Sequence, residues 1–244
     1  MEERSDNDMI ISTDEINELL GKLKFSEEEL VQITSTKGGG NIQGFESWAM
    51  GKIMETEHLN SEAMYRVFRS LWYTKEEVDF VALKEGPVIV KFGCLEDRSR
   101  ILNLMPWLFD KCLFSMVPFV KGKNIASYKF WLSPFWLRVY NIPIKVIDRQ
   151  LALDVGNTIG ELMAIDWKDR NRAWTEFMKI KVKIDISKAL RRVVKFANED
   201  GGEMIGVIKY ERLPDFCYVY GMIRHTTKKC QNSKEGVGIN ESNL

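Results

Sequence analysis

The chain of 244 residues has little of what catalysis requires. It contains only two histidines, His58 and His225, and therefore few side chains that titrate near neutral pH. Gly-x-Ser-x-Gly, His-Glu-x-x-His and dinucleotide-binding glycine motifs are all missing. These absences predict a protein that is not an enzyme and has no small-molecule substrate.

Cysteines are also scarce, and long apolar runs are absent. The chain has four cysteines, and it begins with the acidic, polar residues Met-Glu-Glu-Arg-Ser-Asp where an exported protein would carry an apolar signal. This combination predicts free thiols in a reducing compartment inside the cell, the nucleus or the cytoplasm. No window approaches 18 uncharged apolar residues, so we expect no membrane-spanning helix and no membrane partner.

The net charge is zero, but the charges are unevenly distributed. Residues 1–32 contain three basic and ten acidic side chains, a net charge of −7. Residues 168–195 contain ten basic and three acidic side chains, a net charge of +7. Such asymmetry predicts a basic surface on a folded domain and an acidic tail.

The composition supports a folded domain, because 45% of the residues are hydrophobic and 11% are aromatic. Residues 1–41 are set apart as an acidic, flexible head. Ser12 with Glu15, and Ser26 with Glu29, have the spacing of helix capping boxes. A short amphipathic helix in this head can dock in the groove of a protein partner.

Residues 42–120 show the element order of an RNA-recognition-like domain, the ferredoxin-like split βαβ motif. The predicted elements are a strand over 45–54, a helix over 60–71, strands over 78–83 and 88–92, a helix over 95–105 and a strand over 113–119. RNA-recognition motifs stack bases on aromatic residues of the third strand. That strand is aliphatic here, so we expect the usual base platform to be missing.

A second, smaller α+β unit is predicted over 135–212, after a connector over 121–134. Its elements are strands over 136–140, 162–165 and 177–186, a helix over 148–159, and a hairpin over 192–210. The two halves loosely echo each other's element order. The fold class is therefore α+β, with Trp107, Trp131 and Trp136 expected in the core.

The strand over 177–186 carries the strongest candidate for a binding surface. Because strand side chains alternate between faces, Lys179, Lys181 and Lys183 share one face while the intervening residues enter the core. An exposed row of cations beside aromatic residues is typical of surfaces that bind single-stranded nucleic acid. The alternative is an edge strand charged against aggregation. The predicted contacts are Lys179, Lys181, Lys183, Arg191, Arg192 and Lys195, with Trp174 and Tyr218 for stacking.

The C-terminal part, residues 213–231, has the spacing of a zinc knuckle, followed by a disordered tail over 232–244. Cys217, His225 and Cys230 occupy three ligand positions of the pattern C-x2-C-x4-H-x4-C. Tyr220 stands where the second cysteine belongs. A phenol is a poor zinc ligand at neutral pH, so both Zn²⁺ binding and the metal-dependent local fold are in doubt.

Three segments together resemble a large plant family. They are Pro106-Trp107-Leu108-Phe109, Trp136-Leu-Arg-Val-Tyr-Asn-Ile-Pro143 and Tyr210-Glu-Arg-Leu-Pro-Asp-Phe-Cys217. Members of that family carry a domain of unknown function followed by a zinc knuckle, and look like relatives of the nucleic-acid-binding protein of non-LTR retrotransposons. The resemblance implies binding of RNA or single-stranded DNA, and of zinc. The alternative is a protein-interaction module, or a decayed copy that has lost both activities.

Overall fold

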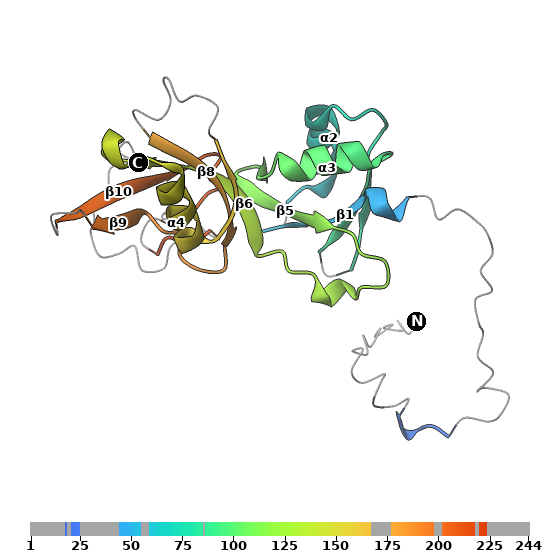
Figure 1. Ribbon diagram of the computed structural model, residues 1–244. Helices are drawn as coiled ribbons and strands as arrows, with labels where there is room; N and C mark the ends of the chain where they lie inside the picture. Colours follow the sequence, from blue (N-terminus) through green and yellow to red (C-terminus); the bar gives the residue numbers. More distant parts are fainter. Residues whose placement is uncertain are drawn as a thin grey trace, which may run out of the picture. The chain divides into compact units, whose positions relative to one another are not determined.

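The computed structural model describes residues 18, 21–24, 44–54, 59–84, 86–166, 177–197, 202–217 and 220–223. The chain divides into two units, residues 1–41 and residues 42–244 (Figure 1). Both sheets belong to the second unit. The predicted capping boxes in the acidic head lie outside the described residues.

The first sheet confirms the predicted β-α-β-β-α-β order. Its elements are η1 (Phe45–Ser47), β1 (Trp48–Ile53), α2 (Ser61–Trp72), β2 (Asp79–Ala82), β3 (Val88–Lys91), α3 (Leu95–Asn103), β4 (Trp107–Phe109) and β5 (Cys112–Pro118). The strands lie in the order β2-β3-β1-β5-β4, and every neighbouring pair is antiparallel. Without the short β4, which the sequence did not predict, this is the strand order of the split βαβ motif.

Local sequence explains where the first helix begins. The Asn60 side chain accepts a hydrogen bond of 3.0 Å from the backbone N–H of Ala63, as expected of a helix N-cap. The apolar positions of α2 and α3 pack on one face of the sheet and form a single core. Trp72 lies within it, with its ring centroid 4.9 Å from that of Phe68 and 5.7 Å from that of Trp107.

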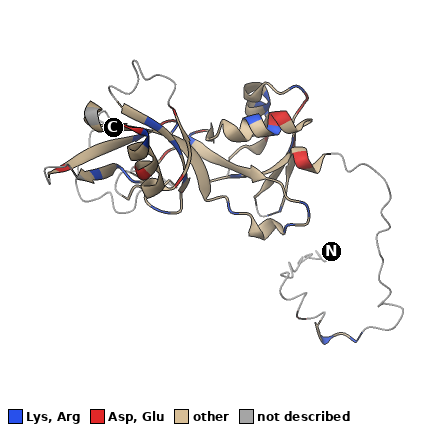
Figure 2. Cartoon of the chain, viewed as in Figure 1, with Lys and Arg blue, Asp and Glu red and all other residues tan. Residues whose placement is uncertain are grey.

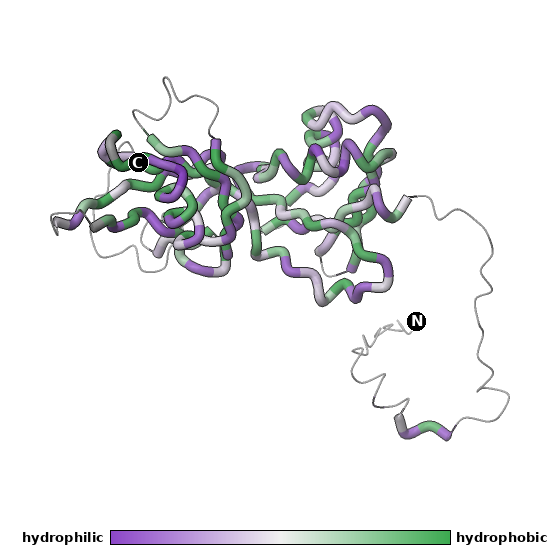
Figure 3. Tube along the Cα trace, in the orientation of Figure 1, coloured by the Kyte–Doolittle hydropathy of each residue, from purple (hydrophilic) through white to green (hydrophobic). Residues whose placement is uncertain are grey.

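The second sheet repeats the topology of the first. Its elements are η2 (Ile125–Ser127), β6 (Leu132–Tyr140), η3 (Ile144–Val146), α4 (Arg149–Ile159), β7 (Glu161–Ile165), β8 (Phe177–Asp185), β9 (Val193–Ala197) and β10 (Glu203–Tyr210). The strand order β7-β8-β6-β10-β9 matches the first order strand for strand. Hydrophobic and hydrophilic residues are mixed along the strands of this sheet (Figure 3). Along β8, the core residues Met178, Ile180 and Val182 alternate with lysines, as expected for a sheet with one face packed against a core.

The described part of the second repeat has no helix corresponding to α3. Ile186 and Leu190, from the segment after β8, and Ile223, next to the Cys217–Met222 bridge, pack in the core of the second sheet. The backbone N–H of Leu190 donates a 2.8 Å hydrogen bond to the carbonyl of Gly221, and Leu190 and Ile223 are buried in the core of the second sheet. The beginning of the knuckle is therefore packed against this sheet rather than free of it.

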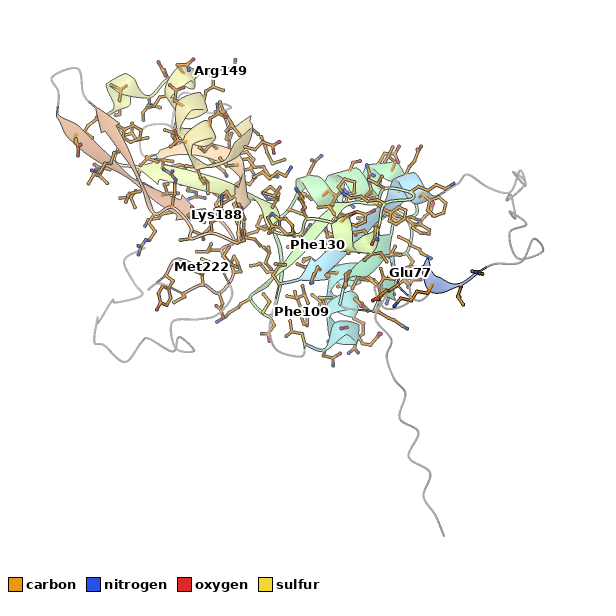
Figure 4. The ribbon with its side chains drawn as sticks, turned by 90° about the horizontal axis from the view of Figure 1, so that it is seen from below. Glu77, Phe109, Phe130, Arg149, Lys188 and Met222 are labelled. Carbon is orange, nitrogen blue, oxygen red and sulfur yellow. The ribbon has the colours of Figure 1, made fainter. Side chains whose placement is uncertain are left out.

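The helix-free face of the first sheet is covered. Tyr128 and Phe130, from the predicted connector, pack on the fully buried Met50 of β1 (Figure 4 labels Phe130). Ile89 of β3 contacts the same cluster. An aliphatic β3 under an aromatic cover is consistent with the expectation that this sheet lacks the usual base platform.

Two of the three tryptophans predicted as core residues lie elsewhere. Trp107 is buried as expected. Trp131 is 41% exposed, because it precedes β6 instead of lying within a packed strand. Trp136 is half-buried on the helix-free face of the second sheet. In that position it can contribute to a binding surface.

Candidate nucleic-acid interface

The helix-free face of the second sheet gathers aromatic and basic side chains on its central strand, β6, and on the two strands beside it, β8 and β10. Along β6, Leu137 and Val139 enter the core, so the alternation places Trp136, Arg138 and Tyr140 on the opposite face. Along β8, the buried residues of the core alternate with the residues of the same open face. We call this surface the platform, and its members are Trp136, Arg138, Tyr140, Phe177, Lys179 and Lys209.

Strand register brings these side chains together. Tyr140 pairs with Phe177 across β6 and β8, and their ring centroids are 5.2 Å apart with an interplanar angle of 47°. The guanidinium of Arg138 lies 4.8 Å from the centroid of Phe177, and the ammonium of Lys209 lies 5.4 Å from that of Tyr140. Such cation–π contacts place a positive charge over each ring. Cations interleaved with aromatic rings are typical of surfaces that bind single-stranded nucleic acid.

The carboxylate of Glu211 contacts two of the cations of the platform. Glu211 accepts a 2.7 Å hydrogen bond from Arg138 and lies 3.2 Å from the ammonium of Lys179. Burial alone would raise the pKa of Glu211, but the hydrogen bonds from Arg138 and Lys179 outweigh it and hold this pKa below its usual value. Glu211 therefore stays ionised, fixing the two cations while neutralising part of their charge.

The predicted lysine row requires correction. Lys179, Lys181 and Lys183 do lie on one face of β8, but they are not a row of exposed cations. Lys181 is only 7% exposed, and its ammonium donates to the carbonyl of Asn103 at the end of α3. Burial lowers the pKa of Lys181, and the neighbouring Arg212 lowers it further. Packing against the first repeat has thus made Lys181 part of the protein interior.

The other predicted lysines are paired with acids. Lys179 lies between Glu211 and Asp166, at 3.2 and 3.9 Å. The ammonium of Lys183 is 3.3 Å from Glu161, and that of Lys195 is 3.2 Å from Glu203. These pairs lower the positive potential that a phosphate would meet.

The remaining predicted contacts lie off the β8 row. Arg191 and Arg192 are exposed in the segment between β8 and β9, and the Arg191 carbonyl accepts a 2.6 Å hydrogen bond from the Tyr210 hydroxyl. Trp174 and Tyr218 lie outside the described residues. Figure 2 shows the basic residues spread over several elements of this unit.

Sequence reasoning overlooked Tyr140 and assigned Trp136 to the core, although a usable signal was present. In the segment Trp136-Leu-Arg-Val-Tyr140, every second residue is aromatic or basic, and the two residues between them are aliphatic. That pattern is typical of a strand with one buried and one binding face.

The described part of the knuckle forms a turn held by its own backbone and by the sheet. The N–H of Cys217 donates to the carbonyl of Met222 at 2.9 Å, and the N–H of Gly221 donates to the carbonyl of Cys217 at 2.6 Å. Gly221 has φ +73°, a conformation that favours glycine. Met222, labelled in Figure 4, belongs to this turn.

These residues do not by themselves fit a four-ligand zinc site. Cys217 is fully buried, whereas Tyr220, at the second ligand position, is 44% exposed. His225 and Cys230 lie outside the described residues. Within the part of the chain that the structure describes, no group of three His, Cys, Asp or Glu side chains is arranged to hold a metal ion.

None of the described helices is long and apolar enough to cross a bilayer.

Comparisons with known proteins find a zinc knuckle and distant relatives. A family model described as "Zinc knuckle" matches residues 184–232. An uncharacterized protein of Arabidopsis thaliana is 19% identical over 134 residues, which cover 55% of this chain and 42% of that protein. The match therefore spans less than half the length of this curated relative.

Two solved structures of the Sex-lethal protein are also similar. An Sxl-lethal protein/RNA complex is 15% identical and covers 68% of this chain and 99% of the other, with a TM-score of 0.25. Sex-lethal RNA recognition domains 1 and 2 from Drosophila melanogaster are 13% identical and cover 57% and 85%, also with a TM-score of 0.25. These TM-scores are too low to support an inference about this chain. The match to the zinc-knuckle model thus begins at the end of β8, includes β9 and β10, and extends beyond the Cys217–Met222 bridge.

Proposed function

We propose that this protein binds single-stranded nucleic acid, RNA or DNA, with little sequence preference and without catalysing a reaction. The observation that carries the proposal is the platform, where Tyr140 and Phe177 lie side by side, with Lys209 over the ring of Tyr140 and Arg138 over that of Phe177. The zinc-knuckle match and the RNA-recognition strand order support it. The retrotransposon ancestry implied by the resemblance belongs to the same proposal.

The platform's chemistry explains the expected tolerance of sequence. Every base has a π-face, so stacking on Tyr140, Phe177 or Trp136 contributes about 1–3 kcal/mol per base whatever the base is. Arg138, Lys179 and Lys209 are placed to bind phosphates, and phosphate contacts carry no sequence information. Duplex bases are already stacked and paired, so a single strand is the better ligand.

A salt titration tests the proposed function. Binding of a fluorescent 20-nucleotide single strand to the full chain should weaken steeply as salt rises. Three phosphate contacts predict a log–log slope of about −2 or steeper, since each contributes roughly 0.7 for a single strand. A duplex of the same sequence serves as the control and should bind more weakly. Absent binding at low salt, or binding that salt does not affect, would contradict the proposal.

We also propose that the protein binds Zn²⁺ weakly. Cys217, His225 and Cys230 are the zinc ligands that the knuckle spacing provides, and we expect three ligands to hold Zn²⁺ only weakly. Replacing Tyr220 by cysteine supplies the missing thiolate. The zinc content of the purified protein, measured by native mass spectrometry, should rise from well below one ion per chain to one. Tyr220→Ser is the control, and equal zinc content in all three proteins would sink the idea.

A protein-binding role is the second candidate, and the outer face of α2 favours it. Val67, Leu71 and Tyr73 are exposed there and line a shallow groove of about 500 Å³ together with Ala63, Arg66 and Ser70. Exposed apolar patches of this kind often mark protein contacts. The acidic head, residues 1–41, remains a candidate segment for a protein partner. If the salt titration detects no binding of nucleic acid, the protein-binding role becomes the better supported function.

A further inference from the structure

The segment that covers the first sheet has an unusual charge composition. Residues 111–147 contain no aspartate or glutamate, but six lysines and arginines. Within this stretch, residues 119–131 join β5 to β6, and we call them the strap. Figure 2 shows basic residues on both sides of η2 in this part of the chain. Joining two strands does not require an excess of basic residues, so these side chains are candidates for another role.

The strap is ordered, because two of its side chains pack on the first sheet. Tyr128 and Phe130 are buried against Met50, and the Tyr128 hydroxyl donates to the carbonyl of Val120 at 3.1 Å and accepts from its N–H at 2.9 Å. The side chain of Asn124 caps η2 by accepting a 2.9 Å hydrogen bond from the N–H of Ala126. The exposed side chains of the strap are therefore carried on an ordered backbone.

Each lysine of the strap lies over an aromatic ring. The ammonium of Lys121 is 5.4 Å from the ring centroid of Phe45, and that of Lys123 is 4.6 Å from that of Tyr128. The ammonium of Lys129 is 6.0 Å from the centroid of Trp131, which is itself 41% exposed. These contacts hold the cations near the surface without neutralising them.

The strap differs in this respect from the basic strand β8. Among the described residues, Lys121, Lys123 and Lys129 have no carboxylate within 4 Å. Lys179 and Lys183 each have one. Three exposed cations with no acidic partner in the described part of the chain favour the strap over β8 as a contact for a polyanion, although the sequence directed attention to β8.

We propose that the strap is a second contact surface for the same nucleic-acid strand, with Lys121, Lys123 and Lys129 on phosphates and Trp131 stacking a base. The inference rests on the proposed function. Trp131 is five residues from Trp136 of the platform, so their Cα atoms are at most about 18 Å apart. Even at the duplex rise of roughly 3.4 Å per nucleotide, about six nucleotides cover that distance, and an extended single strand needs fewer.

The position of the strap also explains the aliphatic first sheet. Because Tyr128 and Phe130 cover the face of β1 and β3, bases cannot reach the positions that usually stack them. The strap then supplies, on its outer side, the cations and the aromatic ring that the covered face cannot present. The first repeat thus contributes to binding through its cover rather than through its sheet.

The experiment compares two triple variants of the full chain in the salt titration. Lys121→Gln, Lys123→Gln and Lys129→Gln together remove the three strap charges. The matched control is Lys183→Gln, Lys188→Gln and Lys195→Gln, which removes three cations that lie 3.2–3.5 Å from a carboxylate. All six side chains are at least partly exposed, so both variants should keep the thermal unfolding midpoint of the natural chain.

The strap variant should reduce the magnitude of the salt slope by about 2, at roughly 0.7 per lost phosphate contact. If its binding curve meets that of the natural chain near 1 M salt, its affinity at 0.1 M is lower by about 100-fold. The control should change the slope by much less than 1. An unchanged slope in the strap variant would overturn this inference and leave the proposed function standing. If the natural chain itself does not bind a single strand, both the inference and the proposed function are wrong.

Discussion

Replacing Tyr140 and Phe177 together by alanine should lower the affinity for a single strand by about 30-fold or more. The two rings form one end of the platform, with centroids 5.2 Å apart on the paired strands β6 and β8. Each stacked base is worth about 1–3 kcal/mol, so losing both rings costs at least about 2 kcal/mol of binding free energy. Fluorescence anisotropy with a labelled 20-nucleotide strand at fixed salt measures the change.

Two further variants make this result specific. Tyr73→Ala removes an aromatic ring that is 85% exposed. Tyr73 follows α2 of the first repeat and is not part of the platform, so this substitution should leave the affinity unchanged. Tyr140→Leu with Phe177→Leu keeps apolar bulk at both positions but removes the rings, and should bind as weakly as the alanine pair. Full affinity in the leucine variant would show that the rings do not stack bases.

Replacing Trp72 by alanine should destabilise the first repeat by about 3–5 kcal/mol, the usual cost of removing a buried large aromatic side chain. Trp72 is fully buried, and its ring centroid lies within 6 Å of those of Phe68, Phe80, Phe92 and Trp107. Its indole N–H has no hydrogen-bond partner among the described residues, so the loss comes from packing alone. Urea unfolding followed by circular dichroism measures the change in the free energy of unfolding.

The neighbouring Leu71 provides the matched control. It lies on the same helix, one residue away, but its side chain is exposed on the outer face of α2. Leu71→Ala should therefore change the free energy of unfolding by about 0.5 kcal/mol or less. Equal effects of the two substitutions would contradict the assignment of Trp72 to the core.

Local sequence signals were sufficient for most of the secondary structure. Asn60 and Asp148 cap α2 and α4 because each side chain accepts a hydrogen bond from a backbone N–H three residues later. The alternation in β8 correctly placed its lysines on one face. Features of this kind depend on neighbours in the chain, so the sequence alone can indicate them.

The errors concern contacts that form only in the folded chain, and one of them joins residues far apart in the sequence. Lys181 is paired with the end of α3, 78 residues away, and no local pattern reveals such a contact. Trp131 was expected to be buried, and is exposed because the strap ends just before β6 begins. The three-residue strand β4 was overlooked because its pairing with β5 is a property of the folded hairpin.

Residue type and spacing were enough to predict the α+β class, most of the element order, the uneven charge and the incomplete set of zinc ligands. Which cations remain available to a phosphate depends on the folded chain. Strand register and packing set the distance from each ammonium group to a carboxylate, and that distance fixes how much positive charge a phosphate encounters. Among the described residues, the strap lysines have no carboxylate within 4 Å, whereas Lys179 and Lys183 are paired with acids and Lys181 is buried.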